Sequence, residues 1–396
     1  MLYILTQHFQ QWLDEVGLFR VVQVFTQVEF RAVAAALVSF ALVLLAGPRV
    51  IAWLRRLKVG DNPEFYNRTL NEISKDKQGT PTMGGILIVG AMLAAIFLLC
   101  DFVWSRYVHL AILVILWLAA VGMFDDWLKL QAARRGPGSR EGLYPKEKLL
   151  FQLGLGALVS WMLWRLNAES GSPAALSLNL PFQRTYDPAT RSAAELTVLN
   201  PGVITLGWLL FTALGAIVLT FFSNAVNITD GLDGLAAGTM TIASLVMVVL
   251  CFVASNQAAA GFLMVPYVPG GKELMVVSGA MAGACLGFLW FNGHPASVFM
   301  GDTGSLPLGG LLAYLSIAIR AEFLLLVLGG IFLIEGGSSL LQQWFFRLTR
   351  GKRIFRCAPL HHHFQMGGLV ETKVTMRMWI GAALLALMTL ALLKLR

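Results

Sequence analysis

The sequence from Tyr107 to Phe124 is a run of about eighteen residues without a formal charge. Because a helix rises 1.5 Å per residue, about 20 apolar residues cross the hydrocarbon core of a bilayer. Similar runs recur along the chain, in which 57% of the residues are hydrophobic and 13% are charged. Soluble domains carry about 25% charged residues. The sequence therefore predicts an integral membrane protein.

Ten candidate spans predict an all-α fold, a polytopic membrane bundle of about ten transmembrane helices that forms one domain over residues 1–396. The spans cover residues 32–54, 83–100, 107–124, 149–166, 203–222, 235–254, 274–291, 306–319, 323–346 and 378–394. The alternating ten-residue segments of a transmembrane barrel are not seen in these runs. The eighth span is short. The ninth is interrupted by the Glu-Gly-Gly-Ser-Ser sequence of residues 335–339, so we expect it to be bent or broken there.

The distribution of Lys and Arg distinguishes the two faces of this predicted bundle. The loops of one face cover residues 55–82, 125–148, 223–234, 292–305 and 347–377 and hold, with Arg49, 20 of the 30 Lys and Arg residues. The positive-inside rule places this face in the cytoplasm and both termini in the periplasm. Such loops also account for the net charge of +8, so we expect no nucleic-acid partner.

Two segments lie outside the predicted spans on the periplasmic side. In residues 1–31, apolar residues recur at helical spacing, which predicts an interfacial helix, and Asp14 and Glu15 argue against a cleaved signal peptide. Residues 167–202 are rich in Ser, Pro and Ala and predict a surface insertion without a catalytic pattern. The four Cys residues are scattered, which predicts neither disulfides nor a metal framework.

The apolar run that ends at Phe124 is followed at once by Asp125 and Asp126. Carboxylates near membrane depth are costly and usually serve a function. Adjacent side chains on a helix point in different directions, which suggests one general base and one metal-binding or orienting group. Lys129 and Lys148 follow in the same loop. The alternative is a helix end with two solvated acids and a helical ion pair to Lys129.

The third cytoplasmic loop has a polar residue at every third position, at Asn224, Asn227, Asp230 and Asp233. On a helix this spacing makes one polar stripe, and oxygen ligands of this kind suit Mg²⁺ or a sugar nucleotide. The pattern lacks the distal Glu of an EF-hand. A Gly-rich turn with capping Asp and Asn residues is the alternative.

The fourth loop runs from Asn292 through Phe299 to Asp302 and Ser305. Its Asp-Thr-Gly-Ser sequence is similar to the aspartic protease turn. That chemistry needs two such carboxylates sharing a proton, and the chain has one copy. Asp302, between two Gly-containing segments, therefore fits a metal ligand close to a phosphate better.

The first and fifth loops carry cations and hydrogen-bond donors. Residues 71–85 combine Lys, Thr and Gly, which can bind an anion, although a solvated turn is the alternative. Residues 351–364 combine a basic run with three consecutive residues, His361, His362 and His363. Consecutive His residues on regular structure cannot all face one metal, so we expect them to face phosphate; a purely structural role is the alternative.

Together the five loops predict a Mg²⁺-assisted site for phosphorylated substrates at the cytoplasmic edge of the membrane. A transporter or proton relay is the competing class, because carboxylates in spans often serve pumps. Glu335 in the interrupted ninth span favours that alternative. The clustering of the other acids at one face argues against it.

The motifs resemble those of the polyprenyl-phosphate N-acetylhexosamine-1-phosphate transferases. The resemblance rests on Asp125-Asp126-x-x-Lys129, Asn224-x-x-Asn227-x-x-Asp230-Gly-x-Asp233-Gly, Phe299-Met-Gly-Asp302-x-Gly-Ser305 and Ala358-Pro-x-His361-His-His363-Phe. It runs in matching order from about residue 40 to the C-terminus. The triple His and the loop containing Lys75 and Thr80 favour the branch that acts on a muramoyl substrate over one that uses UDP-N-acetylglucosamine.

The resemblance implies a reaction, a cofactor and partners. UDP-N-acetylmuramoyl-pentapeptide and undecaprenyl phosphate would give undecaprenyl-pyrophosphoryl-N-acetylmuramoyl-pentapeptide and UMP, with Mg²⁺, in the bacterial inner membrane. A homodimer surrounded by membrane lipid is expected. Whether the lipid phosphate attacks directly or a covalent phospho-aspartate forms, with Asp302 as the nucleophile, stays open.

The resemblance also implies roles for individual residues. Asp125 would deprotonate the lipid phosphate, Asp126 would orient or support it, and Asp302 would hold Mg²⁺. His361 would join them in catalysis and, with its two neighbours, face phosphate. The remaining candidates would bind substrate: Lys75, Thr80, Lys129, Lys148, Asn224, Asn227, Asp230, Asp233, Asn292, Phe299, Ser305, His362 and His363.

Overall fold

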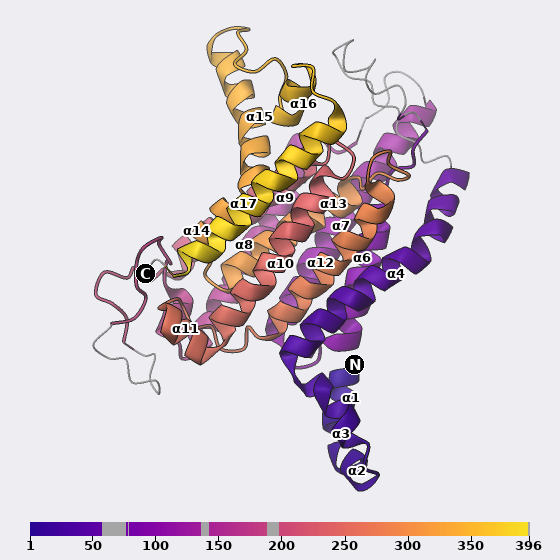
Figure 1. Cartoon of the computed structure of the whole chain (residues 1–396). Helices are drawn as coiled ribbons and strands as arrows, with labels where there is room; N and C mark the ends of the chain where they lie inside the picture. The colour runs from indigo at the N-terminus through magenta and orange to yellow at the C-terminus, as the bar shows by residue number, and fades with distance from the viewer. Residues whose placement is uncertain (58–76, 78, 136–141, 188–197, 395–396) are drawn as a thin grey trace.

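The helices of the protein follow the apolar runs of its sequence. A computed structural model describes residues 1–57, 77, 79–135, 142–187 and 198–394 (Figure 1). Its α-helices are α1 (Leu2–His8), α2 (Gln10–Glu15), α3 (Phe19–Val22), α4 (Val28–Arg56), α6 (Gly85–Leu99), α7 (Arg106–Arg135), α8 (Pro145–Glu169), α9 (Trp208–Thr229), α10 (Leu235–Ser255), α11 (Gln257–Leu263), α12 (Glu273–Asn292), α13 (Asp302–Ala318), α14 (Glu322–Leu328), α15 (Gly330–Leu348), α16 (Leu360–Gln365) and α17 (Glu371–Leu392). Two short 3₁₀ helices are η1 (Gln23–Thr26) and η3 (Pro173–Leu176). The predicted all-α membrane fold is confirmed.

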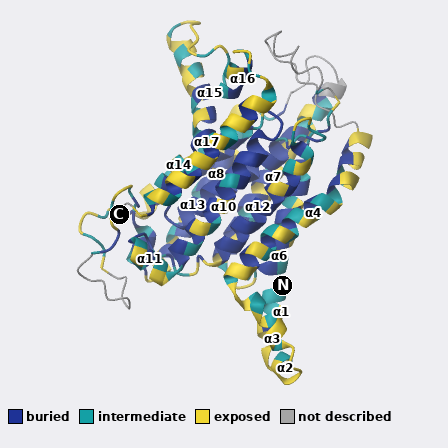
Figure 2. Ribbon diagram, in the orientation of Figure 1, coloured by how far each residue is buried: buried dark blue, intermediate teal, exposed yellow. Residues whose placement is uncertain are grey.

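The centre of the bundle is formed by α12 and α13, whose residues are almost all buried (Figure 2). Small residues make this packing close. A Cβ atom on Gly283 would lie 1.9 Å from the carbonyl oxygen of Ala36, and one on Gly279 would lie 2.3 Å from that of Ala32. These glycines of α12 therefore allow the backbone of α4 to approach closely, as small residues do between membrane helices.

Each of the ten predicted spans falls on a helix or on a bent pair of helices. Among the described residues, seven helices are long and apolar enough to cross a membrane, and the number is eight if the bent pair α14–α15 is one span. Helix α6 is apolar but has 15 residues, and α13 has 17. A total of ten transmembrane helices, and the placement of both termini in the periplasm, stay predictions.

The predicted break in the ninth span is present, but its predicted position is wrong. Helices α14 and α15 meet at Gly329 and are bent by 84°. The Glu-Gly-Gly-Ser-Ser sequence that begins at Glu335 is instead continuous helix within α15. Gly329 fits the bend because its missing side chain makes room for Phe222. Glu335 lies within the helix, and its Oε2 is 2.9 Å from Nδ1 of His361.

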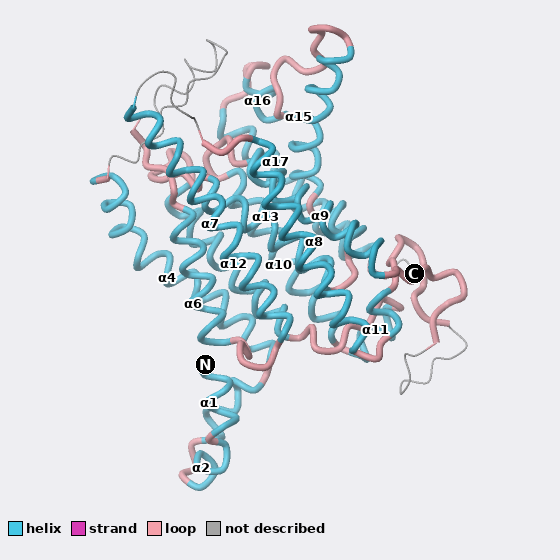
Figure 3. The backbone as a smooth tube through the Cα atoms, turned by 180° about the vertical axis from the view of Figure 1, so that it is seen from behind, coloured by secondary structure: helices cyan, strands magenta, loops and turns pink. Residues whose placement is uncertain are grey.

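The loops of the bundle gather at two opposite ends (Figures 1 and 3). One end carries the last turn of α7 and the turns that follow α9, α12 and α15, and we call it the inner end. The other, the outer end, carries the turns before α7 and α14, the N-terminal segment α1–α3 and the described parts of the predicted insertion at residues 167–202. The isolated antiparallel bridges Ser177–Thr205 and Tyr186–Leu199 fold that insertion back on itself.

Candidate active site

Two buried aspartates and two lysines, of which Lys129 is exposed, form a cluster from three elements at the inner end. The Nζ atom of Lys129 lies 2.6 Å from Oδ2 of Asp125 and 3.3 Å from Oδ1 of Asp302. Lys148 on α8 lies 3.2 Å from Oδ2 of Asp125 and also donates a hydrogen bond to Oδ2 of Asp302. Each lysine therefore bridges the two aspartates, which are both buried. The helices α7, α8 and α13 thus share one network of charges.

Asp126 lies at the edge of this network, with its Oδ1 3.9 Å from Nζ of Lys129, and it holds the first turn of α13. Its Oδ1 accepts the backbone N–H of Asp302 at 3.1 Å, and its Oδ2 accepts the backbone N–H and the hydroxyl of Thr303 at 2.9 and 2.7 Å. The first N–H groups of a helix have no partner within the helix, and a carboxylate is favourable there. Asp126 therefore fixes the position of Asp302, and its predicted role in orienting or supporting the lipid phosphate beside Asp125 stays a prediction.

Glycines permit the close contact between α7 and α13. A Cβ atom on Gly122 would lie 2.2 Å from the carbonyl oxygen of Asp302. Gly301, with φ of 71°, has the backbone conformation that favours glycine, and its Cβ would lie 2.7 Å from Oδ2 of Asp126. At Gly122 and Gly301 the structure has no room for a side chain, so these two positions require glycine.

The polar stripe of α9 divides between site and scaffold. Asn227 donates from Nδ2 to Oδ1 of Asp302 at 2.7 Å and to the hydroxyl of Ser305 at 2.9 Å. Asn224, one turn earlier, bonds instead to Oε1 of Gln152 on α8 at 2.6 Å. Asn227 and Ser305 therefore belong to the surroundings of Asp302, whereas Asn224 links two helices.

Asp233 belongs to a second ionic cluster beside the first. Its Oδ1 lies 2.7 Å from Nζ of Lys77, and its Oδ2 lies 3.0 Å from Nδ1 of His294. Lys77 also lies 2.6 Å from Oε1 of Glu371, which accepts the backbone N–H of Asp233 at 2.8 Å. Burial opposes ionisation of Asp233, but the hydrogen bond and charge of Lys77 outweigh it and lower the pKa of Asp233.

Sequence reasoning missed three members of this second cluster, namely Lys77, His294 and Glu371. Lys77 and His294 lie in two loops that the sequence already predicted to contribute to the site through other residues. Their position in these loops could have identified them as candidates. Glu371 is in the first turn of α17, where an acid is ordinary helix chemistry, and the sequence offered no sign of its role. The predicted residue Lys75 lies outside the described residues.

Asp230 lies between the two clusters. Burial, followed by the charges of Asp302 and Asp126, raises the pKa of Asp230 well above its usual value.

Three other predicted residues frame the second cluster. Asn292 accepts the N–H of Gly234 at 3.1 Å and donates to the carbonyl of Val298 at 2.9 Å, so it joins two loops. The backbone N–H of Phe299 donates to the carbonyl of Pro81 at 2.8 Å, and its ring centroid lies 5.8 Å from Nζ of Lys77. Thr80 is half-buried in the same loop, one residue before Pro81.

The three consecutive His residues have different surroundings. His361 is fully buried: its Nδ1 lies 2.9 Å from Oε2 of Glu335, and its Nε2 would lie 2.3 Å from a Cβ atom on Gly231. Burial and the neighbouring His361 lower the pKa of His362 to about 4. His363 is half-buried and accepts the backbone N–H of Arg356 at 3.1 Å. His361 thus packs against Gly231, whereas His363 contacts the loop before α16.

The chemistry of the first cluster suits a divalent cation. Single oxygen atoms of Asp125, Asp126 and Asp302 all lie within 4.8 Å of one another, and all three residues are buried. Carboxylate oxygens are the ligands that Mg²⁺ prefers, and it typically binds through one or two of them together with substrate phosphates. Asp233, His294 and Glu371 form a second group of the same compactness, but Lys77 already neutralises two of its members.

Comparisons with known proteins agree with these motifs. The model of glycosyl transferase family 4 matches residues 108–320, and signature 1 of the phospho-N-acetylmuramoyl-pentapeptide-transferases matches residues 77–89. A protein of that name from Nitratidesulfovibrio vulgaris strain DP4 is 41% identical over 95% of this chain and 96% of its own length. Another from Flavobacterium johnsoniae is 35% identical over the full length of both chains.

Proposed function

Since the chain belongs to glycosyl transferase family 4 and, within it, to the phospho-N-acetylmuramoyl-pentapeptide-transferases, we propose that it uses UDP-N-acetylmuramoyl-pentapeptide as its donor substrate. The acceptor is undecaprenyl phosphate, and the products are UMP and undecaprenyl-pyrophosphoryl-N-acetylmuramoyl-pentapeptide, the first lipid-linked precursor of peptidoglycan. Residues 1–396 act as one catalytic domain, and the resemblance extends the proposal to a homodimer.

The observation that carries this proposal is the pair Asp125 and Asp302 with two bridging lysines, at the end of a membrane bundle. Two phosphorylated substrates must meet, and their negative charges repel each other. Lys129 and Lys148 are placed to screen that repulsion, because an ammonium group binds phosphate as a point charge. The side chain of Lys129 is 48% exposed, so a substrate can reach it.

Asp302, with Asp125 beside it, would hold Mg²⁺. A bound Mg²⁺ would neutralise charge on the donor diphosphate and on the leaving UMP. Asn227 and Lys148 orient the Asp302 carboxylate through hydrogen bonds, and Asp126 holds the turn from which Asp302 extends.

Asp125 would accept the remaining proton of the lipid phosphate, which then attacks the phosphorus atom bound to the sugar, while the bond to UMP breaks. This assignment favours direct attack over a phospho-aspartate. Asn227, Lys129 and Lys148 contact both oxygens of Asp302, which holds its carboxylate in place beside Asp125.

The second cluster would bind the donor nucleotide. Phe299 offers an aromatic face near a cation, and Asp233 and Lys77 offer a hydrogen-bond acceptor and donors. Thr80, Asp230, Asn292 and Ser305 remain proposed donor contacts nearby, and Lys75, outside the described residues, also remains a proposed donor contact. His363, whose Nδ1 accepts the backbone N–H of Arg356, would donate its Nε2–H to phosphate. The Nδ1–H of His362 is used by Oε1 of Gln365, so the neutral ring of His362 would lie beside the phosphate without donating to it, and the fully buried His361 would hold both in place.

The acidic cluster faces the cytoplasm in this proposal. The loops that the sequence predicts on the side of the acidic cluster carry most of the Lys and Arg residues, and positive loops favour the cytoplasmic side. UDP-linked donors are cytoplasmic, and the polyprenyl tail of the acceptor stays in the lipid. A proton relay receives less support, since Glu335 pairs with His361 at the same end of the bundle.

The test is UMP release by the purified full chain in lipid vesicles. We expect release only when UDP-N-acetylmuramoyl-pentapeptide and undecaprenyl phosphate are both present, and none with UDP-N-acetylglucosamine in place of the donor. Release without undecaprenyl phosphate would point to hydrolysis or to a covalent intermediate. Equal rates with both donors would assign the chain to a sister transferase, and ion flux without UMP release would support a transporter.

A further inference from the structure

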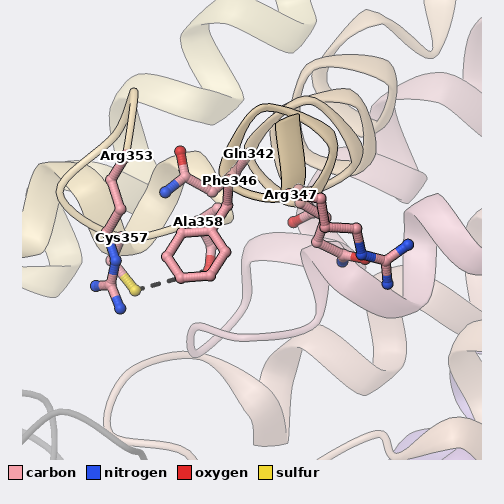
Figure 4. A pocket seen from close by; sticks show the side chains of 8 residues that line it. Gln342, Phe346, Arg347, Arg353, Cys357 and Ala358 are labelled. Atoms are coloured by element: carbon pink, nitrogen blue, oxygen red, sulfur yellow. Dashed lines mark hydrogen bonds between the residues drawn. The ribbon is translucent and has the colours of Figure 1, made fainter. Parts of the chain in front are cut away.

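A cavity of about 350 Å³ lies between α15 and the loop that follows it (Figure 4). Its lining comes from one face of α15 and from residues 353–358, and none of these residues belongs to the acidic cluster or to the second cluster. Figure 4 shows Arg353 and Arg347 at the two ends of the cavity, with the ring of Phe346 between them. Neither arginine has a role in the proposed transfer reaction.

The segment around the cavity is strongly basic. Residues 336–370 contain no Asp or Glu, whereas the turn at the end of α15 holds five cations, Arg347, Arg350, Lys352, Arg353 and Arg356. None of the five forms an ion pair with a carboxylate in the described part of the chain. Elsewhere in the protein, buried cations such as Arg31 and Arg320 do have carboxylate partners. The five positive charges are therefore available to an external anion.

The cavity is held open by hydrogen bonds within the protein. Oε1 of Gln342 on α15 accepts the backbone N–H groups of Ile354 and Phe355, both at 3.0 Å. This side chain ties the loop to the helix at two points. The guanidinium of Arg353 lies 6.0 Å from the centroid of the Phe346 ring. The two sides of the cavity are thus positioned before any ligand binds.

The C-terminal half of α15 combines this charge with exposed apolar side chains. Trp344 is 61% exposed and Leu348 is 65% exposed, and other exposed large apolar residues follow the same pattern at Leu340, Leu341 and Ile354. In a membrane protein, a helix with Trp and Leu on its surface and Arg and Lys at its end is typical of an interfacial position. Figure 2 shows that this part of α15 projects beyond the buried bundle.

We propose that this cavity binds the headgroup of an anionic phospholipid of the surrounding bilayer. Arg347 and Arg353 bind the phosphate, the neighbouring cations attract the anionic surface, and Trp344 and Leu348 contact the acyl chains. Clusters of four to eight Lys and Arg residues on an amphipathic helix are characteristic of anionic-lipid recognition. A soluble anion would gain the charge contacts but would leave the apolar surface exposed, which favours a lipid as the occupant.

A bound lipid would also steady the proposed active site. The loop that lines the cavity continues through Arg356, whose backbone N–H donates to Nδ1 of His363, and then into α16. Fixing the loop therefore fixes the His triplet from one side. Anionic lipid would raise the turnover of the enzyme through this connection, without contacting its substrates.

The test is native mass spectrometry of the full chain in detergent, titrated with phosphatidylglycerol or phosphatidylcholine of the same acyl chains. Each Arg near an anionic surface contributes about 1 kcal/mol to lipid binding. Replacing both Arg347 and Arg353 with Gln should therefore weaken binding at the tightest phosphatidylglycerol site about 30-fold. The Arg377→Gln variant, which removes an exposed cation of α17, is the matched control and should bind as the wild type does. The double replacement with Lys keeps the charge and should retain most of the binding.

Several results would overturn the proposal. One is equal affinity of the wild type for the two phospholipids, and another is equal phosphatidylglycerol binding by the wild type and the folded double Gln variant. A parallel titration with undecaprenyl phosphate that shows stronger binding, lost in the same variant, would assign the cavity to the acceptor lipid. If the double Gln variant in phosphatidylcholine vesicles raises KM for the donor, the cavity holds the pentapeptide instead. The binding assay needs no transfer activity, so it can fail or succeed independently of the proposed function.

Discussion

Buried charges occur at both ends of the bundle, but they are arranged differently. At the outer end, Arg31 forms two hydrogen bonds to Glu273, at 2.8 and 2.7 Å, and Arg320 lies 2.6 Å from Glu322. Each cation there has one carboxylate. At the inner end, three buried carboxylates share two lysines, and Lys129 is close to all three.

This difference separates a structural role from a chemical one. A one-to-one buried pair is electrically neutral and offers nothing to a substrate, and such a pair often contributes little net stability. Arg31 also donates to the carbonyl of Leu99, which uses its hydrogen-bonding capacity to join α4 to the end of α6. The inner cluster carries one more negative than positive charge, and that excess suits a divalent cation.

The largest effect should come from removing divalent metal. Excess chelator is expected to reduce UMP release to background, because only the inner cluster depends on an added cation, and Mg²⁺ should restore it. Thermal unfolding monitored by intrinsic fluorescence should show that the protein stays folded, since the outer ion pairs need no metal. Full activity in excess chelator would show that transfer does not require a divalent cation.

The next largest effect should follow from Asp125→Asn. A general base contributes about 10²–10⁴-fold to a rate, and the amide cannot accept the proton of the lipid phosphate. The initial rate of UMP release at saturating substrates measures this loss. A turnover within a factor of about ten of the wild type would show that Asp125 is not the base.

A smaller loss of turnover, with a loss of stability, is expected for Asp126→Asn. Its amide can satisfy fewer of the N–H groups at the start of α13, and a buried unsatisfied donor costs about 1–3 kcal/mol. Displacing Asp302 by about 1 Å can slow a reaction by about 10²-fold. Thr303→Val removes one of the three hydrogen bonds and serves as the milder control. The combination of unchanged stability and full loss of activity in Asp126→Asn would argue for a direct chemical role.

The smallest effect on turnover is expected for Arg320→Met at the outer end. This change leaves Glu322 buried without its partner, which should lower the free energy of unfolding by about 3–5 kcal/mol. Activity per folded molecule should not change. Replacing both Arg320 and Glu322 with Met should recover most of the stability. A large loss of turnover in the folded single variant would show that the outer end contributes to catalysis. The two ends would then not differ in role as described above.

The sequence predicted the helices well because apolar runs of membrane-spanning length leave a chain few alternatives. It also placed Asp125, Asn227 and Asp302 together, because polar residues at the ends of such runs are costly and therefore informative. The bend in the ninth span was predicted at residues 335–339, because two glycines followed by two serines suggested a break there. In the structure the bend between α14 and α15 is at Gly329.

Other features depended on contacts that no local pattern records. The different orientations of Asp125 and Asp126 follow from Thr303, which lies far away in the sequence. Glu371 joins the second cluster only because α17 returns to the α9–α10 turn. Arg31 and Arg320 could be recognised as buried ions only once their partners were located.

The most direct measurement compares Asp302→Asn with Glu322→Gln, one acid-to-amide change at each end, for both the rate of UMP release and the apparent Tm. The account predicts that Asp302→Asn lowers the rate by at least about 10³-fold with little change in Tm, because the site loses the carboxylate that would hold the metal. It predicts that Glu322→Gln lowers the Tm and leaves the rate per folded molecule unchanged. Turnover by folded Asp302→Asn close to that of the wild type would contradict the assignment of the inner cluster as the transfer site.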